Sequence, residues 1–581
     1  MKRVFLPICC SLLIAGSVSA QTPEPTVTPS PIPTIAVAPA VLPDEPPPVA
    51  PNFKAPLRPL PSAERVGVDN ANQLSLTLEE AIEMALKNNN DIDASRNSVQ
   101  IAEFNLRGAR GIYDPLIEGE SYYDSTSIPT ASIIGGAVNG SVTQKRYFGS
   151  AGFSGFSPYF GGSYAARFDS SRTKTSNTNA TLNPQFPSLL TFTYTQPLLR
   201  NFRFDGSRRL IEIAKKNLAL SDSQFRQRAI DVIAAVEQSY WDLAFALRNL
   251  QVQIDAVKQA RTQLESNQRQ VEKGVLPPID LVAANAQITT FEQSVYVAQQ
   301  EITRSENTLK TLLLADRTSG EWSRPITPVS PIDLDPPKIS LEIAVAEALK
   351  GRPEITQFQA SADVNAIDEK YYRDQKKPEI NIVGSYTAQG LAGTVTSVGT
   401  GRVPENLIGG YGTSLGNLIQ LDYPSYRLGV TISLPWGNRV AEANLGRVLA
   451  EKSRIANQRA QAEQNIEAEV RNALQALRSA ESLLVSAAAT RESAEQLYQS
   501  EQRQFQAGTT TFFLVQQRQT DLISARGREL QAQTLLNRAI SEFQRAIGST
   551  LEVNNVTVSS GGGLFRRPST RDSALNRFEA K

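Results

Sequence analysis

The sequence contains no histidine, and its two cysteines, Cys9 and Cys10, lie close to the N-terminus. Beyond that stretch the chain has no disulfide and no thiol nucleophile. Without imidazole, zinc sites and Ser-His triads lose their usual ligand or base. The phosphate-binding pattern GxxxxGK[ST] is also missing. We therefore predict no catalytic residue, no cofactor and no metal site, and we do not expect an enzyme.

The chain also lacks a strong charge of either sign and a long apolar run. The formal net charge is +1, which gives no electrostatic reason to expect nucleic acid as a partner. The apolar run Val4–Val18 follows Lys2 and Arg3 and is shorter than the roughly 20 residues that span a bilayer. We predict a signal peptide over residues 1–20, rather than an uncleaved anchor. Residues 21–73 are rich in proline and are expected to be a flexible segment.

One helical phrase occurs twice. LEEAIEMALKNNNDI begins at Leu78, and LEIAVAEALKGRPEI begins at Leu341, at an offset of 263 residues. Identities continue in the same register as far as Tyr123 and Tyr386. The chain is therefore expected to be a tandem duplication, with repeat 1 over residues 74–331 and repeat 2 over residues 332–555. Residues 556–581 are expected to be a disordered tail.

Alternating segments follow the repeated phrase. In YRLGVTISLP apolar residues occupy every second position from Tyr426 to Leu434, and LTFTYTQP alternates in the same way. This period of two predicts strands with one apolar and one polar face, which suit either a soluble sandwich or a transmembrane barrel. The aromatic strand ends and the long connections over residues 125–185 and 391–422 favour the barrel. Prolines mark the expected strand–helix junctions, namely Pro115, Pro197, Pro378 and Pro435.

Very long helices are predicted after the strands. From Ile233 to Val257, and from Ile466 to Ala487, apolar residues recur at spacings of three and four, which is typical of a coiled coil. A helix from about Ser207 to Lys273 would be about 100 Å long. Each long helix ends at a glycine, Gly274 or Gly508, which is followed by a short turn and another helix. These patterns predict two helical hairpins.

The ordered set of helix, strands and long hairpin, present twice behind a signal peptide, resembles the TolC-like outer membrane efflux protein family. The duplicated phrase, the strand exits at Gln196–Leu199 and Leu434–Gly437, and the two glycine turns carry the resemblance. It implies a mainly α fold with β: a homotrimeric β-barrel in outer membrane lipid, continued by a periplasmic coiled-coil α-barrel. The implied function is export, with substrates delivered by an inner-membrane pump through a periplasmic adaptor protein.

The resemblance also implies roles for the hairpin turns. In this family the turns dock the adaptor, and the matching residues here are Gly274, Val275, Leu276, Gly508, Thr509 and Thr510. Some members close the periplasmic end with carboxylates six and nine residues after the second glycine. This sequence has Leu514 and Gln517 there, and Asp280 is the acidic residue retained after the first glycine. We therefore expect a gate that multivalent cations block only weakly.

Two questions stay open at this level. The segment FGSAGFSGFSPYFGGSYAARFDS could be an extra hairpin that turns near Pro158–Gly162, so each chain supplies four or six strands. We expect four strands, a 12-stranded trimeric barrel and an extracellular hairpin. The alternative function is a periplasmic coiled-coil scaffold or adaptor without a pore. The sequence indicates no particular exported substrate.

Overall fold

The computed structural model describes residues 65–69, 71–130, 133–137, 140–331, 336–396, 403–559 and 563–566. These residues belong to one contact unit that begins at Pro61. The predicted signal peptide and almost all of the predicted proline-rich segment lie outside the described residues. Within the described ranges, no helix combines the length and the apolar character required to cross a membrane.

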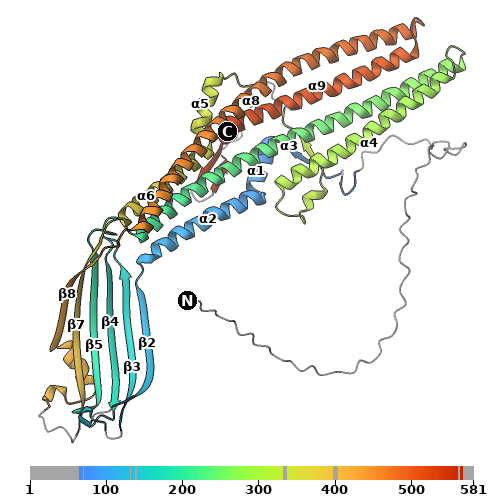
Figure 1. The fold of residues 1–581 in the computed structure, drawn as a ribbon. Helices are drawn as coiled ribbons and strands as arrows, with labels where there is room; N and C mark the ends of the chain where they lie inside the picture. Colours follow the sequence, from blue (N-terminus) through green and yellow to red (C-terminus); the bar gives the residue numbers. More distant parts are fainter. Residues whose placement is uncertain are drawn as a thin grey trace, which may run out of the picture. The chain divides into compact units, whose positions relative to one another are not determined.

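Four long helices form two hairpins that lie side by side (Figure 1). The first hairpin is α3 (Gly206–Glu272) with α4 (Ile279–Leu313), and the second is α8 (Arg439–Gln506) with α9 (Phe512–Ile547). The prediction of a helix from about Ser207 to Lys273 is confirmed to within one residue at each end. Contacts between α3 and α9 join the two hairpins.

Shorter helices precede each hairpin and carry the repeated phrase. The first pair is α1 (Leu78–Asn88) and α2 (Asn90–Arg110), and the second is α5 (Leu341–Gly351) and α6 (Pro353–Gln375). Small 3-10 turns and a four-residue helix complete the helical elements: η1 (Gly111–Tyr113), η2 (Ile133–Gly135), η3 (Gly320–Ser323), η4 (Glu405–Leu407) and α10 (Thr550–Val553).

The repeated phrase places alanines where two helices approach closely. Ala81 and Ala85 are buried in α1, and their counterparts Ala344 and Ala348 are buried in α5. Helix α1 packs against α3, and α5 packs against α8. Since alanine has the smallest side chain that still favours a helix, it permits this approach without breaking the element. The sequence repeat thus gives each long hairpin an equivalent short helix that packs against it.

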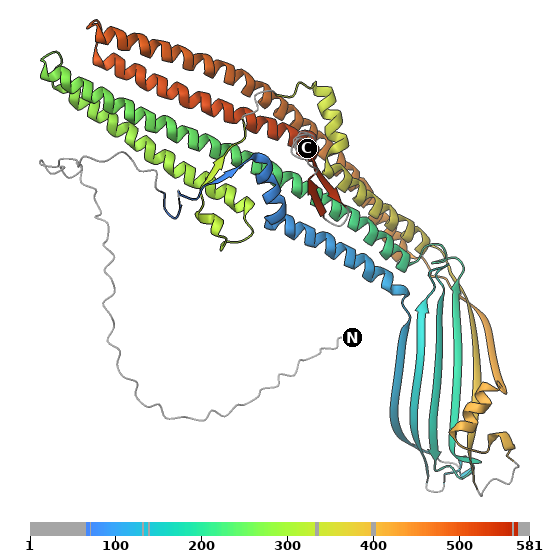
Figure 2. The same ribbon diagram turned by 180° about the vertical axis from the view of Figure 1, so that it is seen from behind.

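Six strands form one antiparallel sheet in the order β2-β3-β4-β5-β7-β8 (Figure 2). Their bounds are β2 (Leu116–Pro129), β3 (Ser141–Phe156), β4 (Ser163–Thr175), β5 (Leu182–Pro197), β7 (Glu379–Val395) and β8 (Tyr423–Ser433). Both repeats therefore contribute to the same sheet. A separate parallel pair joins β1 (Leu74–Leu76) to β6 (Ile326–Pro328) beside the helices.

The expectation of four strands per chain is wrong. Strands β3 and β4 pair along 13 residues, from Gln144↔Thr175 to Phe156↔Ser163, and they are full members of the sheet. Their turn also lies at the helical end and not at the far end, since Arg208 of α3 donates to the Pro158 carbonyl at 3.3 Å. Residues 125–185 are therefore mostly strand, because ladders on both sides hold a glycine-rich sequence extended.

Two other expectations need correction. The connection over residues 391–422 includes the end of β7 and a nine-residue helix, α7 (Tyr411–Ile419). The expected disordered tail begins instead with a hairpin of β9 (Val556–Ser559) and β10 (Gly563–Arg566). Val556 is buried in the core that surrounds Tyr240, and this apolar contact holds the start of the tail. Residues 567–581 lie outside the described residues.

Candidate functional site

The sheet has one apolar and one polar face. The cross-strand pairs place apolar residues of all six strands on the same side of the sheet: Ile117, Phe153, Phe168, Leu190, Phe192, Tyr386, Tyr426, Leu428, Val430 and Ile432. Leu428 is 80% exposed in the single chain. A broad apolar surface of this kind marks an interaction with a membrane or another protein.

The opposite face carries charged and hydroxyl side chains. Arg167 of β4 donates from Nε to Asp169 Oδ1 at 2.7 Å and reaches Glu120 of β2 at 3.4 Å. Thr191 and Thr387 hydrogen-bond across β5 and β7 at 3.2 Å. Sequence reasoning missed these ionic residues, although their odd or even positions along the strands assign them to this face once the register is known. The polar face is suited to water.

The two outer strands leave complementary free edges. Strand β2 carries Glu118, Glu120 and Asp124 on the polar face, and β8 carries Arg427 on the same face. Because β2 and β8 run in opposite directions, β8 of one chain can pair antiparallel with β2 of another. Opposite charges would then lie across the new strand pair, which favours that pairing.

The prolines lie at the ends of strands. Pro115 and Pro378 immediately precede β2 and β7, Pro197 is the last residue of β5, and Pro435 follows β8. Proline cannot donate to a ladder and so stops pairing at these points. The Arg200–Glu379 ion pair also ties the connection between β5 and α3 to the start of β7 at this level.

Both hairpin turns have the same helix-ending geometry. Gly274 and Gly508 have φ values of +71° and +76°, and the following N–H groups of Val275 and Thr509 donate five residues back, to Gln270 and Gln504. This is the Schellman motif, in which glycine takes the left-handed conformation without steric cost. Val275 is 69% exposed.

The remaining residues of the two turns differ in their exposure and in their hydrogen bonds. Leu276 is half-buried, and Thr509 is exposed and donates from its hydroxyl to the Gln504 carbonyl at 3.0 Å. The Thr510 hydroxyl bonds Glu501 of α8. The second turn is therefore tied to its own helix, whereas the first presents an apolar side chain to solvent.

Of the predicted gate residues, Asp280 lies in the first turn of α4, and Leu514 and Gln517 lie in the first two turns of α9. Leu514 and Gln517 are exposed, and Asp280 is half-buried. The hairpins meet nearby, since Gln516 Nε2 donates to the Ala283 carbonyl at 3.1 Å.

The structure adds an ionic pair to this region. Gln517 Nε2 donates to Asp521 at 3.3 Å, and Asp521 also pairs with Arg518 at 3.5 Å. Arg518 thus offsets the one carboxylate that lies a turn beyond Gln517 on α9. In the described parts of the chain, no group of three or more metal-binding side chains is assembled.

A buried carboxylate lies where the two hairpins meet. Glu237 of α3 accepts hydrogen bonds from Ser541 of α9 and from Asn554 Nδ2 at 2.9 Å. Burial raises the pKa of Glu237 above its ordinary value, and these two neutral donors only partly oppose the effect. On the facing helix, the charged groups within four residues of Ser541 have partners of their own: Glu542 pairs with Arg545, and Arg538 pairs with Asp242.

We expect Glu237→Gln to stabilise the contact between the hairpins. Because the pKa is higher in the folded chain, the stability of the wild type is greatest below the ordinary carboxyl pKa and falls as pH rises through the raised value. The variant should unfold a few degrees higher at neutral pH and depend less on pH. Circular dichroism melts across pH measure this, and Glu463→Gln, in an exposed pair, is the control. Equal pH profiles for wild type and variant would contradict it.

Comparison with known proteins now identifies the class. The family model "Outer membrane efflux protein" matches residues 154–313 and 344–549, which is more than half of the chain. The chain belongs to the outer membrane efflux protein family, and the resemblance stated from the sequence is confirmed. The comparison with curated proteins found no match.

Solved structures share the fold. A membrane protein from Pseudomonas aeruginosa is 17% identical with a TM-score of 0.58, and the match covers 86% of this chain and 97% of that chain. The Campylobacter jejuni CmeC outer membrane channel is 16% identical with a TM-score of 0.56, covering 86% and 88%. The open-state Neisseria gonorrhoeae MtrE outer membrane channel is 17% identical with a TM-score of 0.55, covering 82% and 89%.

Proposed function

We propose that this protein is the outer membrane exit duct of a tripartite efflux or type I secretion system. The observation that carries the proposal is the two-faced sheet joined directly to two long helical hairpins, in a chain of the outer membrane efflux protein family. The apolar face meets outer membrane lipid, and the polar face lines the water-filled passage. The hairpins extend into the periplasm. The duct conducts passively.

Three copies close the barrel in this proposal. A lone sheet cannot stay open in hydrocarbon, because the edges of β2 and β8 would leave unpaired backbone groups. One copy supplies six strands, fewer than the eight of the smallest bacterial barrels. A homotrimer, as is typical of the family, supplies 18 strands when β8 of each copy pairs with β2 of the next. This width leaves an aqueous channel.

The hairpin turns face the partners. A periplasmic adaptor docks at the turn residues Gly274–Leu276 and Gly508–Thr510, and an inner-membrane pump delivers substrate through it. Support comes from the matched geometry of the two turns and from the exposed Val275. A scaffold without a pore would also bind partners through helical hairpins, but it has no use for a broad apolar sheet face.

Single-channel recording in a planar bilayer tests the duct. The wild type should give discrete openings, and Leu514→Ala with Gln517→Ala should raise the open fraction if these residues form the constriction. Glu481→Ala, at an exposed position of α8 far from the turns, serves as the matched control. Silence from both the wild type and the opened variant, in protein that is correctly folded by circular dichroism, would favour the scaffold.

The same recordings test the gate chemistry. We expect multivalent cations added on the periplasmic side to block the wild type weakly, because Leu514 and Gln517 carry no charge and Arg518 offsets Asp521. Gln517→Asp should strengthen the block about tenfold, since one added carboxylate contributes about 1–4 kcal/mol to a contacting charge. Block of the wild type at micromolar cation would contradict this account.

A further inference from the structure

Three cations gather at the end of the apolar face that lies furthest from the helices. The register places Lys145 of β3 directly opposite Lys174 of β4, and Tyr147 directly opposite Arg172. Arg172 and Lys174 are two residues apart on one strand, so both point to the same face as Phe168. We call Lys145, Arg172 and Lys174 the cationic trio. All three residues are exposed.

The trio is unusual because like charges directly opposite each other destabilise a strand pair. Among the described residues, no carboxylate forms an ion pair with any of the three cations. The acidic residues of β2 and β4, including Glu120 and Asp169, have the other parity and lie on the polar face. An anion bound between the three cations would remove the repulsion.

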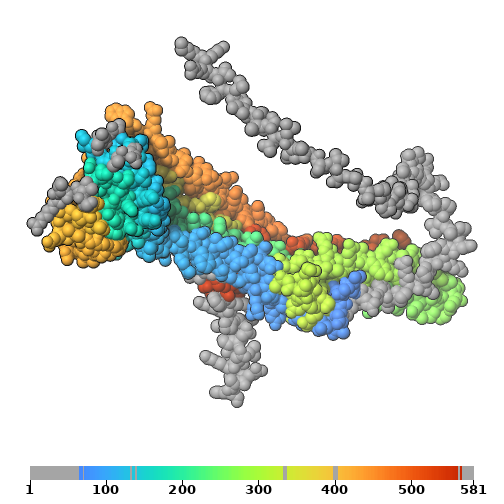
Figure 3. Space-filling model, turned by 90° about the horizontal axis from the view of Figure 1, so that it is seen from below, coloured from blue at the N-terminus to red at the C-terminus, as the bar shows by residue number. Residues whose placement is uncertain are grey.

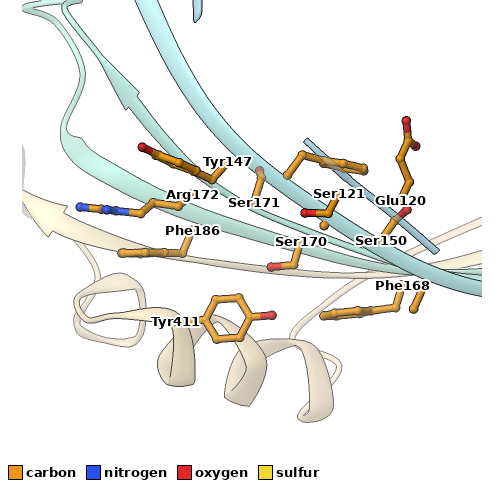
Figure 4. A pocket seen from close by; sticks show the side chains of 13 residues that line it. Glu120, Ser121, Tyr147, Ser150, Phe168, Ser170, Ser171, Arg172, Phe186 and Tyr411 are labelled. Atoms are coloured by element: carbon orange, nitrogen blue, oxygen red, sulfur yellow. The ribbon is translucent and has the colours of Figure 1, made fainter. Parts of the chain in front are cut away.

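An aromatic groove adjoins the trio. Figure 4 shows Tyr147, Arg172 and Phe186 extending from three successive strands, with Tyr411 of α7 beside them. Together with Phe168, these residues line an open hollow of about 660 Å³. Of the trio, Arg172 lines this groove, and Lys145 and Lys174 lie beyond it on the same face of the sheet; Glu120 also contributes to the lining.

Helix α7 forms one wall of the groove because it is held against the apolar face. Ser414 Oγ lies 2.8 Å from Ser188 Oγ, and Asn417 Nδ2 donates to the Leu391 carbonyl at 2.9 Å. A Cβ at Gly390 would lie 2.1 Å from the Ser414 carbonyl oxygen, so only glycine permits this approach. Figure 3 shows the amber segment that contains α7 beside the teal strands.

The outward side of α7 is apolar. Ile419 is 75% exposed, and Ile408 and Leu421 flank the helix with nearly half of their surface exposed. No charged residue occurs between Glu405 and Asp422. These exposed apolar side chains continue the apolar surface of the sheet and are suited to contact with acyl chains.

We propose that the cationic trio and the aromatic groove form a binding site for a phosphate-bearing lipid of the outer leaflet. The trio holds the phosphate, and the acyl chains lie along Phe168, Phe186 and Tyr411 below it. Helix α7 closes the groove and itself enters the membrane boundary. This inference rests on the proposed function, because it requires the apolar face to meet lipid.

A fluorophore on a single cysteine at Ile419 tests the site, because the mature chain contains no other cysteine. The labelled protein is reconstituted in phosphatidylcholine vesicles that contain equal fractions of spin-labelled phosphatidylglycerol or spin-labelled phosphatidylcholine. We expect the anionic lipid to quench the fluorophore with at least fivefold higher apparent affinity. Lys145→Gln with Lys174→Gln should reduce that preference at least fivefold. Arg146→Gln, one residue away but on the polar face, should leave it unchanged.

Other results separate the two proposals. If a probe at Leu428 is quenched by lipid but the probe at Ile419 is quenched only by aqueous iodide, α7 lies outside the membrane and the lipid site is wrong while the barrel stands. Equal quenching by the two lipids also overturns the site. If added inorganic phosphate abolishes the preference, the trio binds free phosphate and not a lipid. If lipid quenches neither probe, both proposals fail.

Discussion

Deleting the β3–β4 hairpin should narrow the proposed barrel by about a third without changing the helical hairpins. Strands β2 and β5 run in opposite directions, so β2 can be joined to β5 by a short turn that replaces the intervening residues. Each chain then supplies four strands, and a trimer supplies 12 in place of 18. Since barrel diameter grows roughly linearly with strand number, the expected ratio of diameters is about two thirds.

The turn that joins β2 to β5 has to preserve the two faces. Ile117 of β2 must point to the same side as Tyr194 of β5, because a slip of one residue would turn the apolar set toward the passage. The deletion also removes a contact between the β3–β4 turn and the connection from β5 to α3, in which Phe160 stacks on Phe202 with ring centroids 5.1 Å apart. We therefore expect the shortened chain to be less stable as well as narrower.

End-on electron micrographs of the proposed trimer measure the diameter directly. A variant that shortens only the loop between β2 and β3 is the matched control, since it keeps all six strands and should keep the full diameter. If the deletion leaves the diameter unchanged, β3 and β4 do not belong to the barrel wall. In that case the polar contacts of Arg167 with Glu120 and Asp169 have no role in lining the passage.

The long helices could be predicted from the sequence because their periodic patterns extend over many turns. The heptad pattern continues along α3, so single residues with weak helix preference do not obscure it. Gly274 then marks the end of the helix, because glycine readily adopts the left-handed conformation that few other residues take. Helix α7 could not be found in this way. Its nine residues include two glycines and span too few turns for a periodic signal, and it is stabilised by the sheet beneath it.

The strands were harder to predict from the sequence. The alternation in β8 is strong enough to define a strand, whereas β3 contains the run FGSAGFSG, whose glycines are typical of loops. It is extended because β2 and β4 pair with it on both sides. The faces of the sheet depend on register as well. Lys145 and Lys174 are 29 residues apart in the sequence, and only the pairing of β3 with β4 shows that they are neighbours.

Arg352→Met should destabilise the second repeat by about 3 kcal/mol. Arg352 lies between α5 and α6, is buried, and donates to Glu354 at 2.5 Å and to Glu469 of α8. The same guanidinium reaches the Ala546 carbonyl of α9 at 3.4 Å. One side chain thus joins three helical segments, and its loss removes the ion-pair partner of Glu354 and one of the two partners of Glu469. The expected effect lies at the low end for a broken buried pair, because Glu469 keeps its contact with Arg545.

Thermal unfolding followed by circular dichroism measures the loss, with two variants for comparison. Arg352→Lys retains the charge but not the planar guanidinium that bonds several acceptors at once, so its stability should lie between those of the wild type and Arg352→Met. Arg471→Met breaks the exposed pair with Glu467 and should cost less than about 1 kcal/mol. An equal shift for Arg352→Met and Arg471→Met would show that the buried network does not stabilise the fold.

The counterpart of Arg352 in the first repeat gives the prediction a second test. The 263-residue offset aligns it with Asn89, which caps α2 by accepting from the Asp91 and Ile92 N–H groups and donates to the Leu312 carbonyl at 3.0 Å. Asn89→Ala removes a cap and should cost about 1 kcal/mol, less than the loss of Arg352. The connection between the two short helices is thus stabilised by neutral hydrogen bonds in the first repeat and by ion pairs in the second. Added salt should affect only the ion pairs of Arg352, and only slightly, because these charges are largely buried.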